Sequence, residues 1–200
     1  GQKIDDHACR KQKQRGGKGE SDKAEHTENY SIELYGWYTH LMVAILQNIR
    51  SLHNVGSIFR TADATGVEKI YLCGVTPTPM DRFGKLRPQF AKVALGAERY
   101  VQWEKYASAG QLIVQLKKDG YHILALEQSS QSIPYYSLPR RFHRTAKSAL
   151  IVGNEVKGLP RALLAKCDAI LEIPMYGKKE SLNVAVAFGV VAFHLKYAAQ

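Results

Sequence analysis

Short apolar runs alternate with helix-like patterns from Leu41 onward, and this alternation restricts the possible folds more than any other feature of the sequence. Continuous apolar runs bounded by turn residues are typical of strands that are buried on both faces. We expect strands at 41–46, 69–74, 121–127, 148–153 and 169–174. Because helical patterns separate them, the sequence predicts an α/β fold with a mainly parallel sheet and helices on both faces.

Helices are expected at 54–65, 110–120, 160–167 and 181–198. The first has an apolar stripe at Val55, Ile58, Phe59 and Ala62, with Gly66 placed to end it. In the simplest interpretation Asn54 is the N-cap of this helix and Arg60 is a solvated side chain. Pro160 suits the first position of the third helix.

Residues 1–29 differ from the rest of the chain in being polar, rich in Gly, Lys and Gln, and without periodicity. We expect them to form a flexible tail, followed by a single domain at 30–200. The net charge is +10, but residues 1–28 carry seven Lys or Arg against six Asp or Glu, so about +9 belongs to the remainder.

That positive charge predicts a polyanionic partner, and RNA or DNA fits it better than a membrane does because no basic amphipathic helix stands out. The densest basic stretches are 82–89 and 139–147. We expect their side chains to contact phosphates, with a solvated charged loop as the alternative. The candidates are Arg82, Lys85, Arg87, Arg140, Arg141 and Arg144.

The three cysteines, Cys9, Cys73 and Cys167, are odd in number and widely spaced, which favours reduced thiols in a cytoplasmic protein. No His, Cys and carboxylate cluster has the spacing of metal ligands, so no metal is expected. The longest apolar run, 184–193, is too short to span a bilayer.

Three stretches that follow predicted strands have an unusual composition: 48–66, 152–160 and 173–187. Loops at the carboxyl ends of parallel strands meet at one edge of a sheet, where ligands bind. Each loop has a structural alternative: Ser181 and Asn183 suit helix caps, and Glu155 a surface carboxylate. No GxGxxG, Walker A or GxSxG motif is present, which leaves the usual nucleotide-binding and hydrolase functions without support.

These segments resemble the three motifs of the SpoU/TrmH family of RNA ribose methyltransferases, in the SPOUT superfamily. The matching stretches are "NIRSLHNVGSIFRTADA" (48–64), "LIVGNEVKGL" (150–159) and "IPMYGKKESLNVAVA" (173–187), with "KVALGAE" (92–98) between the first two. The resemblance implies an S-adenosylmethionine-dependent enzyme that methylates the ribose 2′-hydroxyl in tRNA or rRNA. It also implies an α/β trefoil knot near the C-terminus and a homodimer whose active site lies at the subunit interface.

Carried over residue by residue, the resemblance makes Arg60 the catalytic residue, assisted by Asn54, Glu155, Ser181 and Asn183. In the family this arginine is proposed to act as a base. Because a guanidinium has a pKa above about 12, we expect Arg60 instead to bind the phosphate beside the target ribose through two hydrogen bonds. Glu155 is expected to hold Arg60 or Asn54. The cofactor's adenosine is expected against Leu126, Gly153, Ile173 and Leu182.

Two other functions remain open at this point. One is a non-catalytic RNA-binding or assembly factor on the same scaffold, against which the intact motif residues argue. The other is a knot methyltransferase that acts on a base nitrogen, against which the Arg60 motif argues.

Overall fold

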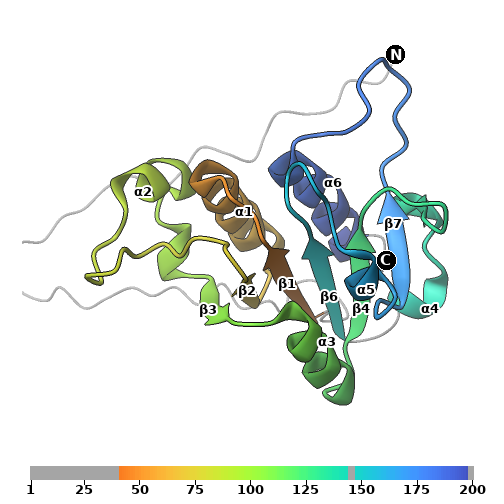
Figure 1. Cartoon of the computed structure of the whole chain (residues 1–200), viewed down its shortest axis with the longest axis horizontal. Helices are drawn as coiled ribbons and strands as arrows, with labels where there is room; N and C mark the ends of the chain where they lie inside the picture. Colours follow the sequence, from red (N-terminus) through yellow and green to blue (C-terminus); the bar gives the residue numbers. More distant parts are fainter. Residues whose placement is uncertain (1–40, 144–146, 198–200) are drawn as a thin grey trace, which may run out of the picture. The chain divides into compact units, whose positions relative to one another are not determined.

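A seven-stranded sheet forms the centre of the computed structural model, which describes residues 41–143 and 147–197 (Figure 1). The strand order is β3-β2-β1-β6-β4-β7-β5 and every pair of neighbours is parallel. The strands are β1 (Leu41–Gln47), β2 (Lys69–Cys73), β3 (Gln102–Tyr106), β4 (His122–Leu126), β5 (Ile133–Pro134), β6 (Lys147–Val152) and β7 (Ala169–Glu172). The expected α/β fold is therefore confirmed.

The central strands bury both of their faces, and each face packs against its own set of helices. In β1, Met42, Ala44 and Leu46 belong to a core shared with α1 (Leu52–Thr65), α2 (Pro88–Ala94) and α6 (Val184–Tyr197). Val43 and Ile45 point to the other face and pack with α3 (Ala109–Lys118) and α5 (Arg161–Leu164). This burial on both faces explains why the strands appear in the sequence as continuous apolar runs.

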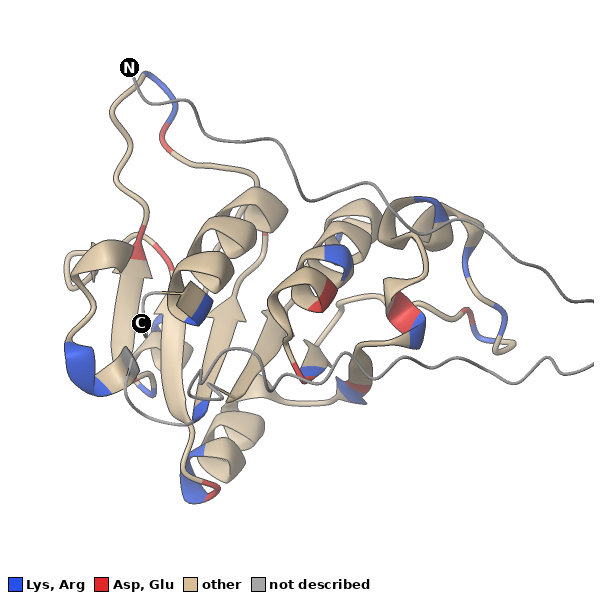
Figure 2. Cartoon of the chain, turned by 180° about the vertical axis from the view of Figure 1, so that it is seen from behind, with Lys and Arg blue, Asp and Glu red and all other residues tan. Residues whose placement is uncertain are grey.

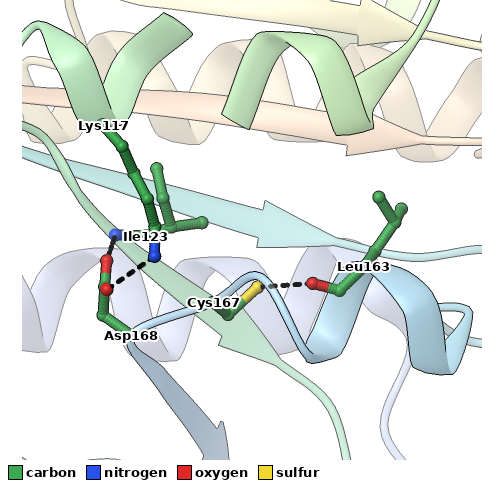
Figure 3. A network of polar contacts seen from close by, with 5 residues as sticks. All are labelled: Lys117, Ile123, Leu163, Cys167 and Asp168. Carbon is green, nitrogen blue, oxygen red and sulfur yellow. Dashed lines mark hydrogen bonds and ion pairs between the residues drawn. The ribbon is translucent and has the colours of Figure 1, made fainter. Parts of the chain in front are cut away.

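A small polar network fixes the loop before β7 to α3 and to the start of β4 (Figure 3). The Asp168 carboxylate accepts hydrogen bonds from Lys117 Nζ, at 2.7 Å, and from the Ile123 backbone N–H, at 2.8 Å. The Cys167 thiol donates to the Leu163 carbonyl at 3.3 Å. These contacts join α3, β4 and α5 at the amino end of β7.

Some element boundaries differ from those expected. Helix α1 begins at Leu52 because Ser51 is its N-cap, accepting from the Asn54 N–H, so Asn54 is not the cap. Gly66 ends the helix in the left-handed conformation, as expected. Pro160 is the N-cap of α5 rather than its first helical residue.

Several short elements were not expected from the sequence. They are α2, β3, β5, the α4 turn (Arg140–His143) and two 3₁₀ turns, Ala97–Arg99 and Tyr135–Ser137. The polar tail expected at 1–29 lies outside the described residues, and the trefoil knot stays a prediction. In the described part of the chain, no helix combines the length and apolar character needed to cross a membrane.

Candidate active site

The three motif loops meet at the carboxyl edge of the sheet, as the sequence predicts, and Glu155 joins two of them. Its Oε1 accepts hydrogen bonds from the Ser51 N–H at 3.0 Å and from Asn54 Nδ2 at 3.0 Å. Its Oε2 accepts from the Arg50 N–H at 3.1 Å. The loop after β6 is thus bound to the first turn of α1 through one carboxylate.

Asn183 extends this network to the third loop. Its Nδ2 donates to Asn54 Oδ1 at 3.0 Å, while its own Oδ1 accepts from the Ala185 N–H at 2.9 Å and so caps α6. Asn54 therefore uses both ends of its amide, donating to Glu155 and accepting from Asn183. The structure places these three candidate residues in one hydrogen-bonded chain.

Arg60 lies apart from this chain. Six residues separate it from Asn54, about 9 Å along the helix, and its side chain is exposed. Within residues 41–143 and 147–197 it has no hydrogen-bond or ion-pair partner, so of the two roles expected for Glu155 the structure shows only the contact with Asn54. The guanidinium is free to bind a group supplied from outside.

A cleft of about 210 Å³ opens beside the network at the ends of β4, β6 and β7. All four residues expected to bind the cofactor line it: Leu126, Gly153, Ile173 and Leu182. Glu155 and Ser181 line it too, and Ser181 has no hydrogen-bond partner among the described residues. The described lining contains three carboxylates, Glu127, Glu155 and Glu172, and neither Lys nor Arg.

Two backbone segments that line this cleft, at Gly153 and at Gly158, approach each other closely. A Cβ added at Gly153 would lie 2.5 Å from the Gly158 carbonyl carbon, closer than real Cβ atoms come to other atoms. Gly158 itself has φ +62°, in the left-handed region that favours glycine. Glycine at these positions lets the chain turn back on itself and present main-chain atoms to a ligand.

Two residues that the sequence did not single out hold this turn. Glu127 Oε2 accepts from the Leu159 N–H at 2.7 Å, which ties the turn to the end of β4. Asn154 Nδ2 donates to the Asn48 carbonyl at 2.8 Å, and its Oδ1 accepts from the N–H groups of Val156 and Lys157. A carboxylate directly after a buried strand and an Asn directly after Gly153 were the available signals.

The hydrogen bonds to Glu155 also set its charge state. Burial raises the pKa of this carboxyl, but donors from the backbone of Ser51, Arg50 and Glu155 itself and from the Asn54 amide outweigh it, so the pKa lies below its ordinary value. The group is ionised near neutral pH and stays an acceptor for all of these donors.

A pH dependence of stability follows from this lowered pKa. The stabilisation is fully present above the unfolded-state pKa of about 4.3 and is lost as the pH falls through the lower folded-state pKa. Glu155→Gln should reduce the free energy of unfolding near pH 7, and the difference from the wild type should shrink below about pH 4. Urea unfolding followed across this range measures it, and a difference that stays constant with pH would contradict the assignment.

The two basic stretches lie at opposite sides of the fold (Figure 2). Arg82 and Lys85 are exposed on the loop between β2 and α2, beside the β3 edge of the sheet. Arg87 differs, because it is half-buried and its Nε donates to the carbonyls of Thr78 and Met80, so it holds the loop.

The second stretch leads into the amino end of β6, away from the edge that carries the site. Arg140 and Arg141 of α4 are exposed there, whereas Arg144 lies outside the described residues. Across the residues described, no three His, Cys, Asp or Glu side chains gather in a way that could hold a metal ion.

Comparison with known proteins places this geometry in a family. A model described as the SpoU rRNA Methylase family matches residues 41–193. The 23S rRNA (guanosine-2′-O-)-methyltransferase RlmB of Neisseria meningitidis serogroup B is 33% identical over 151 residues, 75% of this chain and 56% of that protein. The tRNA (guanosine(18)-2′-O)-methyltransferase of Aquifex aeolicus is 30% identical over 152 residues, 76% of this chain and 67% of that protein.

A solved structure agrees with these sequence matches. The AdoMet-bound rRNA methyltransferase from Sinorhizobium meliloti superposes with a TM-score of 0.70 at 26% identity, covering 79% of this chain and 56% of that one. The chain thus spans little more than half the length of that protein and of the Neisseria relative.

Proposed function

Because the chain belongs to the SpoU rRNA Methylase family, we propose that it transfers a methyl group from S-adenosylmethionine to the ribose 2′-hydroxyl of a nucleotide in tRNA or rRNA. The observation that carries this proposal is the hydrogen-bonded chain from Glu155 through Asn54 to Asn183, which joins all three motif loops beside one cleft. The two sequence relatives are both named as 2′-O-methyltransferases of RNA.

The cleft suits S-adenosylmethionine in shape and in charge. Leu126, Ile173 and Leu182 offer apolar walls for a flat adenine ring, and the Gly153 turn brings main-chain hydrogen-bonding groups close to it. The carboxylates at its rim favour a ligand with positive charge, in a protein whose net charge is +10. When bound, the cofactor supplies an electrophilic methyl group on a positively charged sulfur.

Arg60 is then the residue that acts on the RNA. A planar guanidinium grips a phosphate through two parallel hydrogen bonds, and it stabilises negative charge that develops on the ribose oxygen. The hydroxyl proton passes to the phosphate or to water, since the guanidinium is already protonated near pH 7 and cannot accept it. Asn54, Glu155 and Asn183 hold the helix and loops that surround the reacting oxygen, and Ser181, which lines the cleft, is available to contact the substrate.

Arg60 has no described partner within the single chain, and in the proposed homodimer it would meet the cleft of the second copy. Within the single chain, helix α6 buries Phe188, Val191, Ala192 and Leu195 on one side. On its other side Val186, Val190 and Phe193 stay 53%, 36% and 41% exposed and line an apolar groove against Ser57 and Thr61 of α1. We propose that a second copy covers this groove.

The dimer is tested by placing a charge in the groove. Phe193→Asp should give a monomer of about 22 kDa in sedimentation at micromolar concentration, where the wild type should sediment as a dimer. Methyl transfer should be lost with the dimer. Gln102→Asp, which places the same charge on the exposed β3 edge, is the control and should leave the dimer intact. A wild type that is monomeric under these conditions would contradict the proposal.

The function is tested by incubating the protein with labelled S-adenosylmethionine and bulk tRNA or rRNA and then analysing the nucleosides. A 2′-O-methylated nucleoside is expected. A base-methylated nucleoside would instead support the enzyme acting on a base nitrogen, and no transfer would support the non-catalytic RNA-binding or assembly factor. A chelator is expected to change neither transfer nor cofactor binding, because we propose that no metal takes part.

Three further expectations belong to this proposal. The C-terminal segment is proposed to form the family's trefoil knot, and residues 30–200 the catalytic domain behind a polar tail at 1–29. A cytoplasmic location is proposed from the cysteines, which are odd in number and widely spaced, and of which Cys73 and Cys167 are free thiols.

A further inference from the structure

The turn at 81–87 displays an aromatic ring that the site described above does not use. Phe83 is 71% exposed. The turn is nevertheless well ordered: Asp81 Oδ1 accepts from the N–H groups of Phe83 and Lys85, at 2.8 and 2.9 Å, and the Asp81 N–H donates to the Lys85 carbonyl at 2.8 Å. The Phe83 ring is thus presented to solvent on an ordered turn, where it is accessible to a partner.

The base of the turn is fixed as firmly as its tip. Arg87 Nε donates to the carbonyls of Thr78 and Met80, at 3.2 and 3.1 Å, and Met80 pairs with Leu86 in an antiparallel bridge. The backbone that carries Phe83 therefore loses little conformational freedom when the turn binds a partner, which favours affinity.

The surroundings of the ring are basic. The Arg82 guanidinium carbon lies 4.7 Å from the centroid of the Phe83 ring, and Lys85 is exposed two residues further on. An aromatic face beside cations is the combination that proteins use to bind unpaired nucleotides, since the base stacks on the ring while the cations meet the flanking phosphates. A double helix offers no free base face for such stacking.

The turn is also connected to the active site through the start of its own loop. Thr76 Oγ1 accepts from the Ile49 N–H at 3.0 Å, and the Val75 N–H donates to Asn48 Oδ1 at 3.1 Å. The next residues, Arg50 and Ser51, are those whose N–H groups hold Glu155. The same segment thus positions the site and the loop, which Figure 1 shows in yellow beside α2.

We propose that the turn at 81–87 binds an unpaired nucleotide of the RNA, away from the methylated one, by stacking its base on Phe83, with Arg82 and Lys85 on the adjacent phosphates. This rests on the proposed function in that the partner is RNA. It goes further by assigning the protein a preference for RNA that has an unpaired segment separate from the target nucleotide.

The test compares the binding of two RNA probes to the full chain by fluorescence anisotropy. One is a single strand of about 16 nucleotides, and the other is a blunt duplex of the same sequence. Phe83→Ala should weaken single-strand binding about tenfold and leave duplex binding unchanged. Phe83→Trp should retain it. Tyr100→Ala is the control, since Tyr100 is 77% exposed outside this turn.

The salt dependence separates the ring from the cations. Phe83→Ala should leave the slope of log K against log salt unchanged, whereas Lys85→Ala should reduce it by about 0.7, the share of one phosphate contact on a single strand. Equal losses on both probes, no loss on either, or a wild type that binds neither probe would overturn the proposal. Neither probe needs to be methylated, so a failure of the proposed methyl transfer would be seen separately, in the nucleoside analysis.

Discussion

Arg60→Ala is expected to reduce methyl transfer to RNA by at least about a hundredfold while leaving the affinity for S-adenosylmethionine nearly unchanged. The size of the effect is that of removing one well-placed group that stabilises charge in the transition state. The affinity should persist because Arg60 is not among the residues that line the cleft. Single-turnover transfer measures the first quantity and calorimetry the second.

Two further variants show what property of Arg60 matters. Arg60→Lys should restore little activity, because an ammonium cannot reproduce the planar, two-pronged contact with a phosphate. Arg161→Ala is the matched control, since Arg161 is an exposed arginine on the opposite face of the sheet. The thermal stability of all three variants should resemble that of the wild type, as the side chain lies outside the core. Near-normal transfer by Arg60→Ala would leave Arg60 as a solvated side chain.

The sequence was sufficient to predict the central strands because those strands are buried on both faces. It missed β3, whose residues are exposed or half-buried at the edge of the sheet, and α2, which is shorter than two full turns. In "QWEKY" no apolar run exists, since only Trp103 and Tyr106 pack against the core, one on each face of the sheet, and both are only partly buried. Pairing with β2, which depends on the rest of the sheet, determines that this stretch is a strand.

The residues of the candidate site could be predicted from the sequence, but the contacts between them could not. Loops at the carboxyl ends of parallel strands lie at one edge of the sheet, so the three loops could be expected to meet there. The motifs then identify Asn54, Glu155 and Asn183 as candidate site residues. Which atoms bond could not be predicted, because the partners are 101 and 129 residues apart and their geometry depends on loop conformation. The same reason explains why Glu127 and Asn154 were missed: their function is to hold a turn that only exists in the folded chain.

Gly153→Ala is expected to weaken the binding of S-adenosylmethionine about a hundredfold. The added methyl group would meet the main chain of Gly158 and Leu159 at 2.5 to 2.7 Å, and main-chain atoms cannot turn aside as a flexible side chain does. Overpacking of this kind costs up to about 3 kcal/mol, which corresponds to about a hundredfold in affinity if the turn opens to relieve it. Gly177→Ala is the matched control, because a Cβ there meets nothing within 4 Å.

The effect on binding has to be separated from an effect on folding. Leu182→Ala does this, since Leu182 lines the cleft but is 40% exposed, so its removal should weaken cofactor binding with little change in the free energy of unfolding. Calorimetric titration together with urea unfolding gives both quantities for each variant. If Gly153→Ala and Leu182→Ala both bound the cofactor as the wild type does, the cleft would not be the cofactor site. If only Gly153→Ala lost affinity, the main-chain turn rather than the apolar wall would dominate recognition of the cofactor.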